Sequence, residues 1–329
     1  MRSRPALAAL GALVLAGGLA GCGTTSDAAT DDDTTSGEEI VLVDASGEDV
    51  ILDGPAEDIV ALEWSQAEVL SSLGANLVGL SDVEGYQSWV GTSVPLTSDP
   101  EDVGTRTEPS VERIAELEPD LIVGVPRSVP DEVRDQLEAI APVLLLKSSD
   151  AEDPLGAIEG NVTQLAAATG LEADGEQLVS DFRDGLAERA QKVADSGLEG
   201  TPVVFTSPYS DGSTLTIRMH GPRSGAQAVL TEVGLGAAWE DPGDDESGLS
   251  YTDIEGLTAL PDDSWFLYWA NADSDDPVDT YLAGNAVWDS LPFVQAGHVD
   301  GIADGVWLYG GPDSLLVYTD EVLAAIGVN

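Results

Sequence analysis

The chain has 329 residues, a length that predicts about two domain-sized units with substantial cores. Its 61 Asp and Glu residues outnumber 12 Lys and Arg, and the formal net charge of -49 excludes nucleic acid as a partner because phosphate backbones would be repelled. Hydrophobic residues still make up 43% of the sequence, so we expect most of the chain to fold. The single cysteine, Cys22, excludes internal disulfides and thiolate zinc sites.

Residues 1–21 have the pattern of a signal peptide. Two arginines come first, an apolar stretch runs from Ala6 to Leu19, and small residues lead to Cys22. The apolar stretch is shorter than the roughly 18 residues of a membrane-spanning helix. The tetrapeptide LAGC, which ends at Cys22, resembles the bacterial lipobox, in which the cysteine receives a diacylglyceryl group and becomes the first residue after cleavage. We therefore expect export and lipidation at Cys22, with ordinary secretion as the alternative.

Residues 22–39 are expected to form a flexible acidic linker, because residues 23–39 contain no apolar side chain larger than that of alanine. Folding is expected to begin near Ile40, and from Ile59 onward apolar runs alternate with amphipathic stretches. The expected strands are IVAL, NLVGL, DLIVGV and PVLLL, and the expected helices between them are QAEVLSSLG, VERIAEL and DEVRDQLEAI. This alternation predicts an N-terminal α/β lobe over residues 40–153 with a mainly parallel, buried sheet.

Residues 154–198 lack strand-like runs and are expected to be helical. Apolar residues recur there with helical spacing and predict one long helix from Leu171 to Ala194. A second α/β lobe follows over residues 199–329, with PVVFTS and WFLYW as strands and YTDEVLAAIG as the terminal helix. The predicted fold class is therefore α/β, with two Rossmann-like lobes that each contain a mainly parallel sheet and are joined by a single long α-helix.

A short pattern recurs in the two lobes. Ser65-x-x-Glu68 precedes NLVGL, and Thr252-x-x-Glu255 precedes WFLYW. Both have the spacing of a helix capping box, in which a hydroxyl and a carboxylate accept hydrogen bonds from amides of the first turn. We therefore expect each pattern to begin a helix.

Three longer stretches resemble the periplasmic and lipoprotein iron-siderophore-binding proteins, above all those that bind ferric hydroxamates. They are DIVALEWSQAEVLSSLGANLVGLSDVEGY (58–86), VGTRTEPSVERIAELEPDLIVG (103–124) and VWDSLPFVQAGHVDGIADGVWLYGG (287–311). The resemblance continues in unchanged order from residue 57 onward. It implies the two-lobed fold of class III substrate-binding proteins, with a ligand held in a shallow cleft between rather rigid lobes and delivered to an ABC importer. Iron then arrives already coordinated, and no cofactor or catalytic group is implied.

The resemblance also implies a ligand site made of arginine and aromatic side chains. Arg106 in VGTRTEP matches an arginine that donates to oxygens around the ferric centre, and its planar fork suits hydroxamate or carboxylate oxygens. Trp89 in YQSWV matches a tryptophan that lines the cleft. Trp307 and Tyr309 in VWLYG match two aromatic residues of the opposite lobe. Aromatic faces suit a greasy chelate that needs only a few donors.

The sequence also departs from the hydroxamate binders. VPRS places Arg127 near the position of a second tyrosine, TIRMHGPRSG supplies Arg218 and Arg223, and Trp239 in AAWED matches another cleft tryptophan. Catecholate-binding relatives use three arginines from similar loops, so hydroxamate, catecholate, mixed and carboxylate ligands all stay open. Independently of the resemblance, these three arginines and Arg106 are the four of the ten bases after the signal peptide that are not assigned to predicted helices or a strand end. They suggest an anionic ligand, with carbonyl capping as the alternative.

Glu68 and Glu255 have two interpretations. The resemblance implies that one glutamate on each lobe docks onto arginines of the permease dimer, whereas the helix cap is the alternative. His220 and His298 stand alone, without Cys, Asp or Glu in ligand spacing, so we expect surface or turn positions and no metal site, although His220 could face the cleft.

Taken together, the sequence predicts a monomeric lipoprotein on the outer face of the cell membrane of a Gram-positive bacterium. It would bind a ferric siderophore and contact the membrane through its lipid only. Haem or cobalamin bound to the same fold is the alternative. A lipid-anchored enzyme is a further alternative, but the chain has no GxSxG motif and neither histidine lies in a triad-like context.

Overall fold

The computed structural model describes residues 39–211, 214–269, 275–302 and 305–328. The predicted signal peptide, the predicted lipidation site Cys22 and the linker up to residue 38 lie outside the described residues. Within the described ranges, no helix is both long enough and apolar enough to cross a membrane.

The first half of the chain builds a five-stranded sheet in which every neighbouring pair is parallel, in the order β5-β4-β3-β8-β9. The strands are β3 (Ile59–Ala61), β4 (Leu77–Leu80), β5 (Glu101–Asp102), β8 (Leu121–Gly124) and β9 (Val143–Leu145). Every residue of β3, β8 and β9 is buried, which explains their uninterrupted apolar sequences. The four strands predicted from apolar runs are confirmed.

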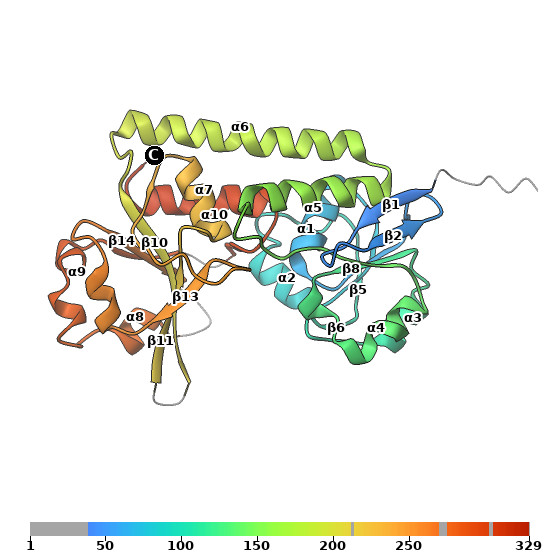
Figure 1. Ribbon diagram of the computed structural model, residues 1–329, viewed down its shortest axis with the longest axis horizontal. Coiled ribbons are helices and arrows are strands. Elements are labelled where there is room, and N and C mark those ends of the chain that lie inside the picture. The colour runs from blue at the N-terminus through green and yellow to red at the C-terminus, as the bar shows by residue number, and fades with distance from the viewer. Residues whose placement is uncertain (1–38, 212–213, 270–274, 303–304, 329) are drawn as a thin grey trace, which may run out of the picture. The chain divides into compact units, whose positions relative to one another are not determined.

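Helices connect these strands, and together they form what we call the N-terminal lobe (Figure 1). The helices are α1 (Trp64–Leu73), α2 (Val83–Trp89), α3 (Val111–Glu116) and α4 (Asp131–Glu138), with a short 3-10 turn η1 (Pro126–Ser128). A two-stranded ribbon, β6 (Gly104–Thr105) and β7 (Glu108–Pro109), holds Arg106 at its turn. Because the carboxyl ends of parallel strands meet at one edge, residues that follow β3 and β8 lie close together there.

A hairpin that the sequence did not suggest begins the described fold. It pairs β1 (Ile40–Val43) with β2 (Asp49–Leu52). The side-chain amide of Gln164 pairs with the backbone N–H and C=O of Val43 at 2.8 and 2.7 Å and so extends the hairpin edge.

The second half of the chain builds a six-stranded mixed sheet in the order β13-β11-β10-β14-β15, with β12 beside β10. Parallel pairing joins β14 to β10 and to β15, whereas β11 is antiparallel to β10 and to β13. The strands are β10 (Pro202–Asp211), β11 (Thr214–His220), β12 (Gly236–Ala237), β13 (Leu249–Thr252), β14 (Trp265–Trp269) and β15 (Val299–Ile302). We call this sheet and the helices that accompany it the C-terminal lobe. Its helices and 3-10 turns are α7 (Gly225–Glu232), η2 (Glu255–Ala259), α8 (Pro277–Tyr281), η3 (Trp288–Ser290), α9 (Pro292–Ala296) and α10 (Pro312–Ala325).

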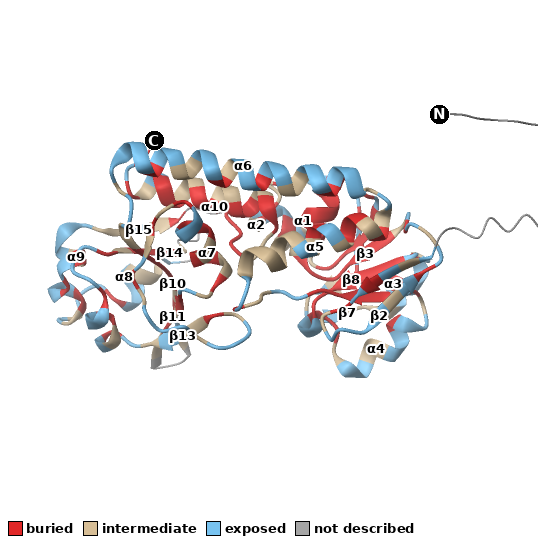
Figure 2. Ribbon diagram, turned by 45° about the horizontal axis from the view of Figure 1, so that its top comes forward, coloured by how far each residue is buried: buried red, intermediate tan, exposed pale blue. Residues whose placement is uncertain are grey.

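Two helices connect the lobes. The long helix α6 (Glu172–Ser196) has 25 residues and confirms the helix predicted from 171 to 194. Its Leu178 packs against the core of the N-terminal lobe, whereas Phe182 belongs to that of the C-terminal lobe, so α6 contacts both. Figure 2 shows the buried face of α6 turned inward and its exposed face outward. The preceding helix α5 (Pro154–Thr169) buries its apolar face in the N-terminal core.

The two predicted capping boxes are wrong. Helix α1 begins at Trp64 with Glu63 as its N-cap, and the Glu63 carboxylate accepts from the Trp64 amide at 2.9 Å. Ser65 therefore already lies inside the helix, where its hydroxyl donates to Gln66 instead. The second pattern begins a 3-10 turn, η2, which has no side-chain cap.

Candidate ligand-binding site

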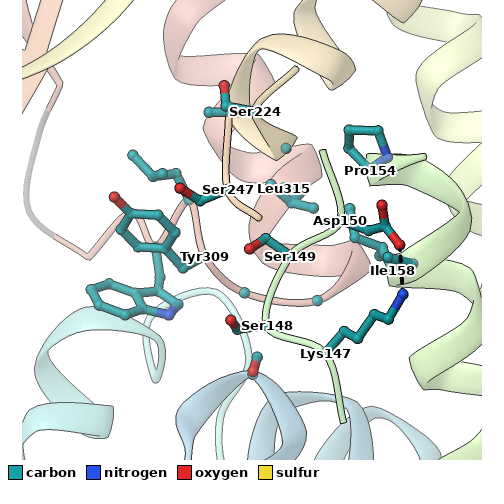
Figure 3. A pocket seen from close by; sticks show the side chains of 18 of the residues that line it. Lys147, Ser148, Ser149, Asp150, Pro154, Ile158, Ser224, Ser247, Tyr309 and Leu315 are labelled. Atoms are coloured by element: carbon teal, nitrogen blue, oxygen red, sulfur yellow. Dashed lines mark hydrogen bonds and ion pairs between the residues drawn. The ribbon is translucent and has the colours of Figure 1, made fainter. Parts of the chain in front are cut away.

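A cavity of about 500 Å³ is lined by residues of both lobes. This volume falls within the range of small-molecule sites in proteins. Figure 3 shows part of its wall, with Tyr309 on one side and the Lys147–Asp150 ion pair on another. The walls thus come from segments far apart in the sequence, and we take the chemistry of each lobe in turn.

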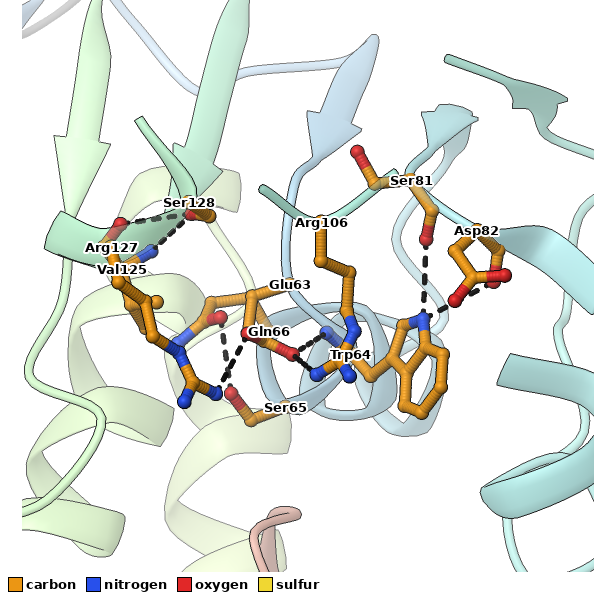
Figure 4. A network of polar contacts seen from close by, with 10 residues as sticks. All are labelled: Glu63, Trp64, Ser65, Gln66, Ser81, Asp82, Arg106, Val125, Arg127 and Ser128. Carbon is orange, nitrogen blue, oxygen red and sulfur yellow. Dashed lines mark hydrogen bonds and ion pairs between the residues drawn. The ribbon is translucent and has the colours of Figure 1, made fainter. Parts of the chain in front are cut away.

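On the N-terminal lobe, one buried carboxylate holds two arginines (Figure 4). Arg106 Nη1 donates to Glu63 Oε1 at 2.8 Å, and Arg127 Nη2 donates to Glu63 Oε2 at 3.1 Å. Glu63 follows β3 and Arg127 follows β8, so the parallel sheet brings them together. The guanidinium carbon of Arg106 also lies 3.9 Å from the centre of the Trp64 ring, a cation–π contact that fixes its plane. Two positive charges thus share one negative partner beside the cavity.

On the C-terminal lobe, the arginine that lines the cavity has no carboxylate partner among the described residues. Arg218 lies on β11 next to Tyr251 of β13, and it forms no ion pair with any described residue. Burial opposes its charge, but the hydroxyls of Tyr309 and Tyr251 raise the pKa of Arg218. Its guanidinium carbon also lies 5.8 Å from the centre of the Tyr209 ring. His220, at the end of the same strand, is fully buried, and burial together with the charge of Arg218 lowers its pKa to about 3. The imidazole is therefore neutral at physiological pH.

Four buried polar atoms of the cavity wall make no hydrogen bond of ordinary geometry with any described residue. They are Arg218 Nε, His220 Nε2, Trp307 Nε1 and the Tyr309 hydroxyl. Buried polar groups in folded proteins almost always have partners, and each one left without costs about 1–3 kcal/mol. Four such atoms around one cavity, two of them N–H groups that can only donate, indicate a site built to form hydrogen bonds with a ligand.

Aromatic rings form another part of the wall. Trp307 stacks on Trp269 with ring centroids 5.8 Å apart, and Tyr309 meets both rings edge-on. Trp89 packs against both indoles, with its ring centroid 5.7 Å from that of Trp269 and 6.0 Å from that of Trp307. The indole of Trp269 is tied down by a hydrogen bond to the carbonyl of Val306 at 3.1 Å. The wall is therefore rigid and apolar beside the unpartnered donors.

The cavity brings together five of the residues expected to bind ligand: Arg106, Arg127, Arg218, Trp307 and Tyr309.

The other three expected ligand contacts do not line the cavity. Trp89 packs against the aromatic wall. Trp239 packs on a separate core cluster and donates to the Ser250 hydroxyl at 2.8 Å. Arg223 donates to the carbonyl of Ala151 at 2.9 Å and pairs with Asp245, so its charge is already engaged. None of the three lines the cavity in this structure, and their contact with a ligand stays a prediction.

Sequence reasoning also missed lining residues, namely Glu63, Trp269 and Tyr251, and it assigned no definite role to His220. Glu63 left a usable signal, because an acid directly after a buried parallel strand lies at the edge where such sheets bind ligands. Trp269 ends the apolar run WFLYW and was taken only as part of a strand. His298 stacks on Trp265 at 4.5 Å and does not line the cavity.

The docking role expected for Glu68 is wrong in this structure. Its side chain is fully buried, and its carboxylate accepts hydrogen bonds from backbone amides of the opposite lobe. A carboxylate so enclosed presents no surface to a permease. Glu255, by contrast, is exposed on η2, and its docking stays a prediction.

Comparisons with known proteins agree with this geometry. A family model for periplasmic binding proteins matches residues 59–304. The iron(3+)-hydroxamate-binding protein FhuD of Escherichia coli is 29% identical over 269 residues, which cover 82% of this chain and 86% of that protein. The probable siderophore-binding lipoprotein YfiY of Bacillus subtilis is 25% identical over 296 residues, 87% of either chain.

Solved structures are similar as well. The siderophore-binding protein FhuD of Vibrio cholerae, crystallised with Fe3+ and Desferal bound, superposes with a TM-score of 0.70 at 25% identity and covers 82% of this chain and 97% of its own. SirA of Staphylococcus aureus, complexed with staphyloferrin B, has a TM-score of 0.68 at 20% identity over 88% of this chain and 99% of its own, which shows likeness of fold.

Proposed function

Since the chain belongs to the periplasmic binding protein family, we propose that it captures a ferric siderophore in the cavity between its lobes and delivers it to an ABC importer. The observation that carries this proposal is the set of four unpartnered polar atoms in the cavity wall. A ferric siderophore surrounds its iron with oxygen atoms, and these can accept from Arg218, Trp307 and Tyr309. The iron arrives as cargo, already coordinated, and the protein supplies hydrogen-bond donors and an aromatic wall.

The charge of the cavity favours an anionic chelate. Arg106, Arg127 and Arg218 line it, whereas Glu63 is shared between the first two. The exposed Glu246 offsets part of the remaining positive charge. In a chain of net charge -49, such a local excess of arginine is a specific feature of the site.

The class of siderophore is inferred from the relatives and from the charge of the cavity. The relatives named above include proteins named for hydroxamate and for Desferal, and these favour a ferric hydroxamate. Arg127 and Arg218 would also suit the additional negative charge of a catecholate, mixed or carboxylate chelate. Haem and cobalamin are the alternative ligands, and both belong in any binding test.

We further propose that the protein is a monomer held at the outer face of a Gram-positive cell membrane by a lipid on Cys22. Exposed Glu255 would then contact the permease dimer. Glu255→Ala should leave ligand affinity unchanged and reduce uptake of radioactive iron by cells, because it removes a contact with the importer only. Unchanged uptake would assign Glu255 no docking role.

Tryptophan fluorescence tests the proposed function, because Trp269 and Trp307 line the cavity. The protein is titrated with the iron(III) complexes of Desferal, citrate and staphyloferrin B, and with haem and cobalamin. Gallium(III) complexes, which lack the strong colour of the iron complexes, serve as optical controls. We expect saturable quenching at micromolar or lower concentration for one class of ferric chelate. A flat response to every ferric chelate would rule the proposal out.

A further inference from the structure

The carboxylate of Glu68 joins the two lobes. Glu68 lies on α1 and is fully buried. Its Oε2 accepts from the Gly311 amide at 2.8 Å, and its Oε1 accepts from the Ser314 amide at 2.9 Å. These amides belong to the first turn of α10, whose own N-cap, Gly311, has no side chain to offer. The N-terminal lobe therefore caps a helix of the C-terminal lobe, where a negative charge is also favoured by the helix dipole.

Two glycines allow the backbone of the C-terminal lobe to approach the Glu68 carboxylate closely. A Cβ atom added at Gly310 would lie only 2.3 Å from Glu68 Oε2, and one at Gly311 would lie 2.8 Å from Val69 Cγ2. Both glycines thus leave room that the glutamate fills. They directly follow Trp307 and Tyr309, so the segment 307–311 connects the capped helix to the cavity wall.

We propose that Glu68 is a positioning residue for ligand capture, which fixes the segment 307–311 by capping α10 across the boundary between the lobes. Glu68 does not line the cavity and acts through Trp307 and Tyr309. Its effect on the segment is independent of which ligand binds, whereas its effect on affinity rests on the proposed function.

A second contact between the same helices provides a natural comparison. The Ser72 hydroxyl of α1 donates to Asp313 Oδ2 of α10 at 2.7 Å, but this hydrogen bond lies at the exposed surface. Water can replace an exposed hydrogen bond at little cost, whereas the buried amides capped by Glu68 have no such substitute. Removal of the Glu68 contact should therefore disturb the segment 307–311 much more than removal of the Ser72 contact.

The protonation of Glu68 gives the proposal a pH signature. Burial raises the pKa of Glu68 to about 7, against the opposing effect of the Ser314 and Gly311 amides. The titratable groups that face it are Tyr86 of α2, whose own pKa is raised by burial and by the charge of Glu68, and Asp313 of α10. A protonated carboxyl has one oxygen that donates, so it cannot accept from both amides. The cap is therefore expected to weaken as the pH falls through about 7.

The test substitutes Glu68→Gln, which keeps the size of the side chain and replaces one acceptor with an NH2 group. Without ligand, hydrogen–deuterium exchange of peptides covering residues 306–316 should accelerate about tenfold. Affinity for whichever ferric chelate binds the wild type should fall about tenfold at pH 8, and this difference should vanish below about pH 6 because protonated Glu68 resembles glutamine. Ser72→Ala and the exposed Glu116→Gln are matched controls, and both should stay within about twofold of the wild type.

Gly310→Ala tests the same contact from the other lobe and covers the case in which Glu68→Gln folds poorly. It should accelerate exchange in the same peptides, because the added methyl group displaces the carboxylate. Unchanged exchange in folded Glu68→Gln and Gly310→Ala would overturn the proposal. Faster exchange with unchanged affinity would overturn the link to ligand capture. If the wild type binds no ferric chelate, the proposed function fails, and the exchange result alone decides whether Glu68 positions the segment.

Discussion

The two lobes prepare their sides of the cavity in opposite ways. On the N-terminal lobe, Arg106 and Arg127 are held in place by Glu63 before any ligand arrives. On the C-terminal lobe, Arg218 and His220 are buried or half-buried without comparable partners. The first side is stabilised by its own contacts, whereas the second bears an energetic cost that a bound ligand would relieve. Substitutions should therefore affect stability and affinity together on one lobe and separately on the other.

Arg218→Ala is expected to have the largest effect on binding. Charge-assisted hydrogen bonds of 1.5–3 kcal/mol correspond to a loss of affinity of about 100-fold. The unfolding midpoint should change little, because the loss of contacts with Tyr309, Tyr251 and Tyr209 is offset by the removal of a buried Nε atom that has no hydrogen-bond partner. Calorimetric titration and thermal unfolding measure the two quantities. Arg223→Ala is the control, since Arg223 lies outside the cavity wall; equal losses for both variants would contradict this assignment.

Glu63→Ala should lower stability most, and affinity should fall with it because Arg106 and Arg127 lose the carboxylate that holds them. It removes the shared partner of two arginines and the N-cap of α1, and we expect unfolding free energy to fall by about 2 kcal/mol. This loss of unfolding free energy is smaller than that expected for a fully buried ion pair, because the Arg127 side chain is 62% exposed. Urea denaturation measures the change. A variant as stable as the wild type would mean that the N-terminal side is not held by this carboxylate.

Arg106→Ala should lower both affinity and stability, each by less than the substitutions described above. We expect affinity to fall about tenfold, since one donor to the ligand is lost. Stability should fall by about 1 kcal/mol, because Glu63 keeps Arg127 as a partner. Arg106→Lys keeps the charge without the planar fork and should recover stability better than affinity. Full recovery of affinity by lysine would show that charge alone matters at this position.

The buried His220 of the C-terminal lobe allows the comparison between the two lobes to be tested by changing the pH. The pKa of His220 is lowered to about 3, so the unfolded chain binds its proton at a higher pH than the folded protein does. His220 therefore contributes stability above its unfolded pKa near 6.5 that is lost as the pH falls toward 3. His220→Phe should reduce acid destabilisation in that range, by roughly 2–3 kcal/mol at pH 4. An unchanged acid profile would mean that the imidazole is not excluded from water.

Much of the fold could be predicted because buried parallel strands and long helices leave strong local patterns. The β3 and β8 runs have no exposed position, and α6 repeats its apolar residues with helical spacing. The β1–β2 hairpin left a weak signal, because each strand has four residues and Val41 and Ile51 remain exposed. The local hydrophobic pattern of a sequence therefore identifies fully buried strands and long helices better than short, partly exposed strands.

The site was predictable in its residue types but not in all its partners. Arg106 and Trp307, which the resemblance assigns to the ligand site, both line the cavity. The resemblance did not distinguish Trp89, which packs against the aromatic wall, from Trp269, which forms part of it. Glu68 illustrates the same limit, because its partners lie 243 and 246 residues away. Contacts of that kind depend on how the lobes pack and leave no trace in a local pattern.

The most direct test of the account is a crystal structure of the protein with the ferric chelate that binds most tightly in the titration series. The account predicts that chelate oxygens lie within hydrogen-bond distance of Arg218, Trp307 or Tyr309, with Arg106 still paired to Glu63. A chelate bound elsewhere, or bound in the cavity with these C-terminal donors still unpartnered, would contradict it.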